Sequence, residues 1–254
     1  MLLLIDAGNT LVKWALVPAR ADRGSPWLDS GAVAHEHLNS LKGRWQNQGQ
    51  TSSLRRVLIS NVAGSEIHDR LENLLRGMSP APASIEWFAS APFLGGVRNC
   101  YVDFTQLGCD RFAAMIGAHA LFPRRPLIVA TCGTATTIDA VAADGTFIGG
   151  MILPGLRLMA ASLARNTALL PQVSTSDSTF SVFANNTDDA IISGCITAQV
   201  GAIERAVAQH ARSCGAIQCV LSGGAAPFIA PHLSIPYGIA DNLVLIGLHA
   251  IATV

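Results

Sequence analysis

The first third of the chain alternates short apolar runs with turn-forming residues. Residues 2–6 (LLLID) form an apolar run that ends in Asp6, and residues 11–17 (LVKWALV) follow the turn-forming pair Gly8-Asn9. Two such runs joined by this pair predict a β-hairpin. We also expect strands at 28–34, 56–61 and 85–88, a helix over 65–75 and a loop over 78–84.

The rest of the chain continues the alternation of strands and helices. Residues 91–108 are rich in turn formers and show no clear period, whereas a helix is expected from Cys109 or Asp110 to Phe122, where Pro123 stops it. Further strands are expected at 127–130, 136–143, 146–154 and 217–222, and further helices over 155–164, 188–212 and 242–252. This order of elements predicts a mixed α/β fold.

The predicted layout occurs twice. The pattern Asp6-x-Gly8-x-Thr10 ends the first strand, and Thr131-x-Gly133-Thr134 ends a comparable strand 125 residues later, close to half of the 254-residue chain. We therefore expect two copies of one α/β unit, with a glycine and threonine turn from each facing the other across a cleft.

Composition narrows the range of functions. Charged residues make up 13% of the chain and hydrophobic residues 50%, and the 17 Lys and Arg balance the 17 Asp and Glu. This excludes a disordered chain and argues against a broad basic surface for nucleic acid or membrane lipid. So few charges leave little polar surface for a monomer, which favours a homo-oligomer.

The chain shows no pattern that predicts secretion or membrane insertion. Its first residues, MLLLIDAGNT, have no basic region and only five apolar residues before Asp6, so we expect no signal peptide and no membrane segment. The six cysteines form no C-x-x-C pair, which is typical of free thiols in a reducing cytoplasm.

Three glycine turns are candidates for a phosphate or nucleotide site. In the first, the glycine lets backbone amides approach a ligand while Asp6 can orient a hydrated Mg²⁺. Each of these segments also has an ordinary structural explanation. Gly8-Asn9 is more often a plain hairpin turn, and Thr131 to Asp139 can be a threonine-rich strand. Ser222-Gly223-Gly224 can be a glycine turn of the kind that commonly ends a strand.

Asp110 and Arg111 open a predicted helix and are the candidates for acid–base chemistry. Asp110 can accept the proton of a substrate hydroxyl beside Arg111, or it can simply be an acid that favours a helix start. We expect that position to lower its pKa. Thr187 precedes two aspartates, where helix capping is the ordinary role, and the seven histidines form no cluster. The motifs of P-loop proteins and of serine hydrolases do not occur.

Taken together, these segments resemble the type III pantothenate kinase family, a member of the superfamily of acetate and sugar kinases, heat-shock ATPases and actin. The resemblance covers essentially the whole chain. It rests on IDAGNTLVKWAL at the start, YVDFTQLGCDRFAAMIGA at 101–118, TCGTATTIDAV at 131–141, GGMILPGLRLMAASLARNTALLP at 149–171, and LSGGAA and DNLVLIGL near the end.

The resemblance implies a duplicated ribonuclease-H-like (actin-like ATPase) fold, with domains at 1–112 and 113–254 and an active-site cleft between them. It implies a cytoplasmic homodimer that transfers the γ-phosphoryl group of ATP to pantothenate in the first step of coenzyme A biosynthesis, with Asp110 as the base. Mg²⁺ would lie near Asp6, held through water. The implied ATP contacts are Asp6, Ala7, Gly8, Asn9, Thr10, Leu11, Val12, Lys13 and Thr134, and the implied pantothenate contacts are Tyr101, Gly108, Cys109, Asp110, Arg111 and Thr187.

Two departures from the family pattern affect these expectations. Thr131 stands where most members carry the aspartate that binds a monovalent cation, so a K⁺ or NH₄⁺ site is in doubt. Phe104 replaces a proline three residues after Tyr101, which is expected to loosen that loop. Two alternatives to the kinase also remain open. One is a non-catalytic regulator like the Bvg accessory factors, and the other is a kinase of another small hydroxyl compound.

Overall fold

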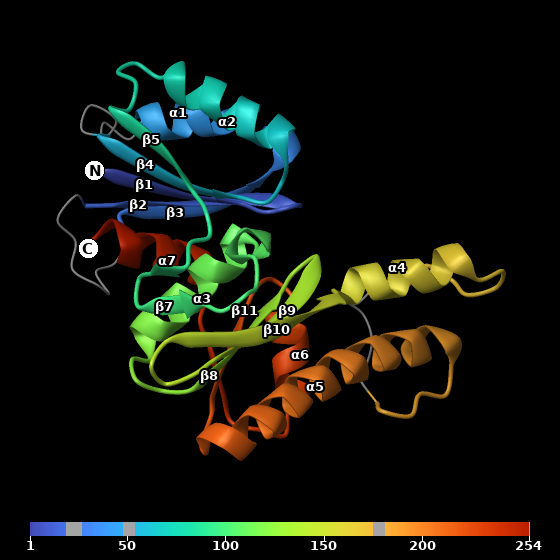
Figure 1. Ribbon diagram of the computed structural model, residues 1–254. Coiled ribbons are helices and arrows are strands. Elements are labelled where there is room, and N and C mark those ends of the chain that lie inside the picture. Colours follow the sequence, from blue (N-terminus) through green and yellow to red (C-terminus); the bar gives the residue numbers. More distant parts are fainter. Residues whose placement is uncertain (19–26, 48–53, 175–180, 254) are drawn as a thin grey trace. The chain divides into compact units, whose positions relative to one another are not determined.

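The computed structural model of the chain describes residues 1–18, 27–47, 54–174 and 181–253 (Figure 1). By its internal contacts the chain forms two units. The first consists of residues 1–121 together with 243–254, and the second of residues 122–242. The domain boundary expected between residues 112 and 113 falls within helix α3 (Cys109–Leu121), and as a statement about domains it stays a prediction.

The first unit contains a sheet with strand order β3-β2-β1-β4-β5. The predicted hairpin is confirmed, because β1 pairs antiparallel with β2 and β2 with β3, whereas β4 and β5 run parallel to β1. The strands are β1 (Leu2–Ala7), β2 (Leu11–Val17), β3 (Asp29–Ala34), β4 (Arg56–Asn61) and β5 (Ser84–Phe88), and a small hairpin of β6 (Phe93–Leu94) and β7 (Val97–Asn99) follows.

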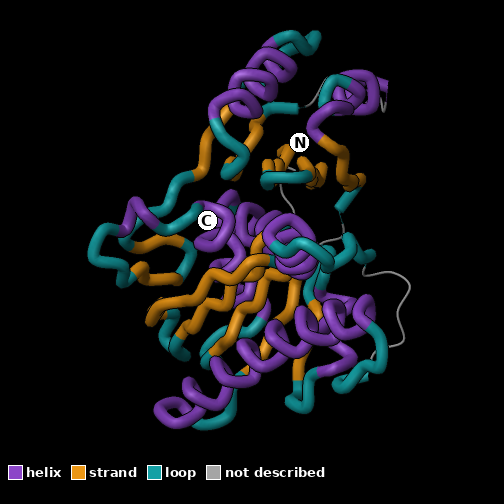
Figure 2. The backbone as a smooth tube through the Cα atoms, turned by 90° about the vertical axis from the view of Figure 1, so that its right-hand side faces the viewer, coloured by secondary structure: helices purple, strands orange, loops and turns teal. Residues whose placement is uncertain are grey.

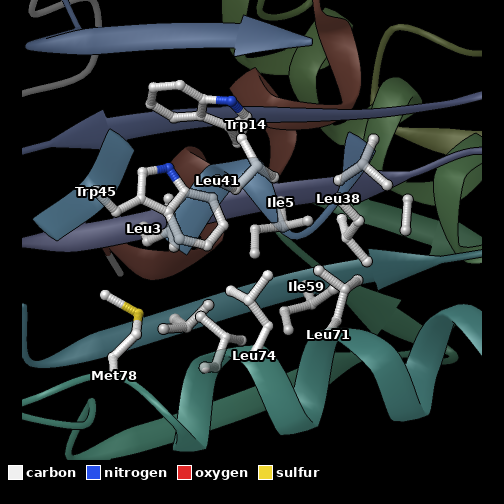
Figure 3. Packing of buried hydrophobic residues seen from close by; sticks show 14 of the residues in the cluster. Leu3, Ile5, Trp14, Leu38, Leu41, Trp45, Ile59, Leu71, Leu74 and Met78 are labelled. Atoms are coloured by element: carbon white, nitrogen blue, oxygen red, sulfur yellow. The ribbon is translucent and has the colours of Figure 1, made fainter. Parts of the chain in front are cut away.

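Helices cover both faces of this sheet (Figure 1). Helices α1 (Ser40–Asn47) and α2 (Ser65–Arg76) pack on one face and build the main core of the unit, in which the Trp14 and Trp45 rings meet edge to face at 5.8 Å (Figure 3). Helix α1 was not expected. Its sequence is mostly polar, and of its residues Leu41 and Trp45 reach the core, one turn apart.

The other face carries α3 and α7 (Leu243–Ala252), which cross each other closely. Gly117 of α3 lies against the carbonyl of Leu243, and Gly247 of α7 lies against the carbonyl of Ala113, so that a Cβ atom at either glycine would overlap the opposite backbone. This crossing joins the C-terminal end of the chain to the helix that begins at Cys109.

The second unit contains strands in the order β10-β9-β8-β11-β12. They are β8 (Leu127–Cys132), β9 (Ala135–Val141), β10 (Thr146–Pro154), β11 (Gln218–Ser222) and β12 (Tyr237–Ile239), and the helices are α4 (Leu156–Asn166), α5 (Thr187–Cys214) and the short α6 (Ala226–Ile229). The pattern of apolar residues did not indicate β12 and α6, which are only three and four residues long. Helix α5 lies against β8 and β9 (Figures 1 and 2).

The two units repeat one topology, as expected. The five strands β1–β5 of the first unit and the five strands β8–β12 of the second both lie in the spatial order third, second, first, fourth and fifth. The turns between the first and second strands also match, since the Gly8 amide donates to the Leu11 carbonyl at 3.1 Å and the Gly133 amide to the Ala135 carbonyl at 3.0 Å. The predicted duplication is therefore confirmed at the level of hydrogen bonds.

Helix α5 is the segment that most closely tests the expectation that no segment would span a membrane. It is long and apolar enough to do so by length and composition, and among the described residues it is the one helix that meets this test. Its apolar residues have another explanation, because Ile191, Ile196 and Ile203 belong to the core of the second unit.

The α3–α7 crossing generates a test of the fold. Gly117→Ala is expected to lower the free energy of unfolding by about 1–3 kcal/mol, because the added methyl group overpacks a backbone contact. The matched control is Gly201→Ala in α5, where a Cβ atom meets nothing within 4 Å. This control should be neutral or stabilising by up to about 1 kcal/mol. Urea unfolding measures both, and equal effects would contradict the packing described here.

Candidate active site

The first candidate group is Asp6, near the end of β1. The strand register places Asp6 opposite Lys13 of β2 and opposite Ser60 of β4. The pKa of Asp6 is raised to about 7, mainly by burial, while the Lys13 charge acts in the lowering direction and the Asp110 charge in the raising direction. Two carboxylates and an ammonium group therefore interact in this unit, and Asp6 takes up a proton near neutral pH.

The turn after Asp6 connects β1 to β2. We define the Gly8 turn as residues 8–10, between β1 and β2. Ala7 and Val12 face each other as buried register partners at its base, Leu11 is exposed, and Asn9 and Thr10 are exposed at its tip. Beyond the Gly8–Leu11 hydrogen bond, the Gly8 carbonyl accepts a hydrogen bond from Nε2 of His35 at 2.8 Å. His35 was not among the candidates, because no local pattern connects it with residue 8.

The start of α3 is tied to the strand beside Asp6. Sγ of Cys109 lies 3.3 Å from Oγ of Ser60, the register partner of Asp6, and 3.5 Å from the carbonyl oxygen of Asn61. Cys109 therefore has a clear structural role, which is to attach the first turn of α3 to the end of β4. Asp110, the next residue, is thereby brought within electrostatic reach of Asp6.

The expected low pKa of Asp110 is wrong. Burial raises the pKa of this carboxyl above its usual range, and the amide and the charge of Arg111 offset only part of that effect. Oδ1 of Asp110 accepts the Arg111 amide at 2.8 Å. Desolvation therefore outweighs the favourable helix start, and Asp110 is a stronger base than its position in the sequence indicated.

Gly108 allows this placement of the Asp110 carboxylate. A Cβ atom at residue 108 would lie 2.7 Å from Oδ1 of Asp110, so a side chain there would push the carboxylate out of its position. The Gly108 carbonyl also accepts the Phe112 amide at 3.1 Å in the first turn of the helix. The glycine of the L-G-x-D-R segment thus leaves room for the carboxylate two residues later.

Arg111 and Tyr101 form the other half of this region. The Arg111 side chain is buried, and its Nη1 donates to the Tyr101 hydroxyl at 3.2 Å, with Cζ 5.8 Å from the ring centroid. Asn99, which the sequence analysis overlooked, accepts the Tyr101 amide at 3.1 Å and donates to the Phe104 carbonyl at 3.1 Å. These bonds hold the loop at the point where Phe104 replaces proline.

Thr131 and Thr134 belong to the second unit. Thr131 is partly buried beside its register partner Thr137, and Thr134 is exposed in the turn between β8 and β9. The Gly155 amide donates to the Thr134 carbonyl at 2.9 Å. Gly155 lies so close to this turn that a Cβ atom on it would overlap Gly133 and Thr134, and Gly223, with φ 93°, lies equally close to Cys132 at the end of β8. The third glycine turn therefore supports the second.

Thr187 does not cap α5. It is exposed as the first residue of that helix, and the cap is Asn186, whose side chain accepts the Asp189 amide at 3.0 Å and donates to the Asp189 carboxylate at 2.7 Å. The prediction that Thr187 caps the helix was thus wrong by one residue, because asparagine and threonine are both good capping residues and stand next to each other here.

The described part of the chain contains no cluster of three or more His, Cys, Asp or Glu suited to a metal ion. All six cysteines are free thiols. A divalent cation here would therefore depend on one or two carboxylates and on the oxygens of its ligand, as Mg²⁺ commonly does with a nucleotide.

Comparison with known proteins agrees with this geometry. The family model for type III pantothenate kinase matches residues 2–209. The type III pantothenate kinases of Janthinobacterium sp. (strain Marseille) and Herminiimonas arsenicoxydans are 58% and 56% identical, each over 99% of this chain and 97% of the relative. A solved glucokinase from an Antarctic psychrotroph has a TM-score of 0.52 at 12% identity, over 98% of this chain and 97% of its own, which indicates a shared actin-like ATPase fold.

The raised pKa of Asp6 predicts that the ionised carboxylate lowers the free energy of unfolding at neutral and higher pH. Asp6→Asn should increase the free energy of unfolding at pH 8 by roughly 1–4 kcal/mol, since each pKa unit corresponds to about 1.4 kcal/mol. The folded protein binds this proton more tightly than the unfolded chain does, so the wild type loses stability as the pH rises from about 4 to about 7. The variant does not, and the two should differ little near pH 4.

Urea unfolding of both proteins at pH 4.5, 6 and 8 measures this difference. Asp241→Asn, which changes an exposed aspartate, is the control and should shift stability equally at each pH. A pH-independent difference between wild type and Asp6→Asn would contradict the buried charge.

Proposed function

Because the chain belongs to the type III pantothenate kinase family, we propose that it transfers the γ-phosphoryl group of ATP to the hydroxyl of pantothenate (EC 2.7.1.33), with Asp110 as the base. This is the first step of coenzyme A biosynthesis. The observation that carries the assignment of the base is the Asp110 carboxylate, which burial makes more basic at a helix start next to Asp6.

In the proposed reaction, an Asp110 oxygen accepts the proton of the pantothenate hydroxyl as that oxygen bonds to the γ-phosphorus. The bond from phosphorus to the bridging oxygen breaks, and ADP leaves. Phosphoryl transfer has a loose transition state, so orientation of the hydroxyl contributes more than complete removal of its proton. A carboxylate fixed by Gly108 and by the Arg111 amide suits that role.

The nucleotide end of the proposed site is the strand and turn from Asp6 to Lys13, together with Thr134. Backbone groups of a glycine turn and the Lys13 ammonium suit the phosphates of ATP. Asp6 suits a hydrated Mg²⁺, because the charge of Asp110 already disfavours its ionised form and a divalent cation would relieve that repulsion. When bound, Mg²⁺ would neutralise charge on the phosphates.

The pantothenate end of the proposed site consists of Tyr101, Gly108, Cys109, Arg111 and Thr187. Arg111 carries a permanent positive charge within a buried setting and can attract the carboxylate of pantothenate. Its bond to the Tyr101 hydroxyl keeps the guanidinium group in one place, which favours an ordered substrate.

The protein is further proposed to act as a cytoplasmic homodimer. Large apolar side chains are exposed on β10 and α4 of the second unit, and a second copy of the chain would remove them from water. They are Ile148, Met151, Ile152, Leu158 and Leu163. The molar mass in solution, from light scattering, tests this, and a mass of one chain would contradict it.

Asp110→Asn is expected to lower kcat at least tenfold while the protein remains folded. The amide keeps the shape of the carboxylate but cannot accept the proton. Pantothenate-dependent release of ADP, followed in a coupled assay, measures the rate, and circular dichroism checks folding. Near-normal turnover would defeat Asp110 as the base.

Two further outcomes separate the alternatives. No ADP release with pantothenate, but release with another hydroxyl compound from a panel of sugars and hydroxy acids, would favour a different kinase. No release with any compound would favour a non-catalytic regulator.

The rate is expected to change less than twofold when Na⁺ replaces K⁺ or NH₄⁺. Thr131 offers no charge where most members of the family carry a cation-binding aspartate, and it lies beside another threonine. The same coupled assay at constant ionic strength measures this. A strong requirement for K⁺ would show that other groups bind the cation.

A further inference from the structure

We infer that His35 is a positioning residue for the nucleotide and that its hydrogen bond to the Gly8 carbonyl sets the direction in which the Gly8 turn presents its backbone. The inference rests on the proposed role of that turn in binding ATP. His35 lies outside every segment on which the family resemblance rests.

The contact joins residues that are 27 positions apart. His35 directly follows β3, and its Nε2 lies 2.8 Å from the carbonyl oxygen of Gly8. A carbonyl oxygen can only accept, so Nε2 carries the hydrogen and the imidazole donates. The backbone of His35 is held in turn, because Nη2 of Arg70 in α2 donates to the His35 carbonyl at 2.6 Å.

This hydrogen bond acts on the peptide unit that links Gly8 to Asn9. That unit is planar and trans, so its N–H points opposite to its C=O. When His35 holds the Gly8 carbonyl, the Asn9 amide must point away from His35. Glycine at position 8 would otherwise let this peptide rotate at little cost. His35 therefore selects one orientation of an amide at the tip of the turn, where a phosphate oxygen would bind.

The second unit has a support at the equivalent position but makes it from backbone. The strand registers pair Leu11 with Ala34 and Ala135 with Pro154. Leu11 and Ala135 are the residues whose carbonyls accept the Gly8 and Gly133 amides.

The residue after the third strand is therefore His35 in one unit and Gly155 in the other. Gly155 reaches the matching turn through its own amide, which donates to the Thr134 carbonyl at 2.9 Å. Both units thus hold the first turn from the same place in the fold, one through a side chain and one through the main chain.

Three variants test the inference. His35→Leu removes the donor and is expected to raise the KM for ATP about 5- to 10-fold, as loss of one hydrogen bond would, while the KM for pantothenate stays within twofold. His35→Gln can place an amide donor near Nε2 and should recover most of the loss. His37→Leu makes the same change at an exposed histidine two residues away and should have no effect.

The outcomes separate this inference from the proposed function. If Lys13→Ala weakens ATP binding and His35→Leu does not, the inference alone fails. If neither variant changes ATP binding, the nucleotide assignment of the turn fails with it. An equal rise in both KM values would show a general structural role and would overturn the inference.

The tautomer of His35 gives a readout that is independent of activity. A long-range ¹H–¹⁵N spectrum of the wild-type protein should show a hydrogen on Nε2 of His35. The His35→Gln spectrum assigns the signal by its loss. Protonation at Nδ1 alone would overturn the inference, whether or not the leucine variant folds.

Discussion

The candidate site depends on two carboxylates, Asp6 and Asp110, that the fold removes from water, so that burial raises the pKa of both and the Asp110 charge adds to the effect on Asp6. Asp6 is fixed by the β1 register, and Asp110 by the attachment of α3 to β4 through Cys109 and Ser60. Burying two carboxylates near each other costs free energy of folding. The packing of the core and of the helix crossing in the first unit must offset this cost. The cation binding and proton acceptance proposed for this site would both use these carboxylates, which gives a reason for tolerating the cost.

The duplicated topology explains how a chain with so few charged residues can form such a site. Each unit ends its first strand in a glycine turn, and each turn receives support from the residue that follows the third strand. In the second unit Gly155 also packs directly on the turn, and Gly223 packs on the end of the strand before it. Most of the positioning is therefore done by backbone groups at close range. Charged side chains are needed only where charge itself is handled, which agrees with a charged fraction of 13%.

The elements that could be predicted from sequence are those with a clear apolar pattern within their own residues. The hairpin of β1 and β2, the buried strands β4, β8 and β11 and the long helices fall in this group. Helix α1 and strand β12 do not. α1 has two apolar residues that reach the core, and β12 is a three-residue strand that pairs with β11, so both depend on a partner far away in the chain. The cap of α5 was assigned to the wrong neighbour because local preference does not distinguish Asn186 from Thr187.

The sequence by itself determined the family, the duplicated α/β layout and the identity of the residues that can do chemistry, because motifs and apolar periodicity are local properties of the chain. Only the tertiary structure decided how those residues behave. It raised the pKa of Asp110, where helix position alone predicted a low one, because burial depends on what packs around the carboxyl group. It also brought His35 to Gly8, since a contact between residues far apart in sequence exists only once β3 has paired with β2.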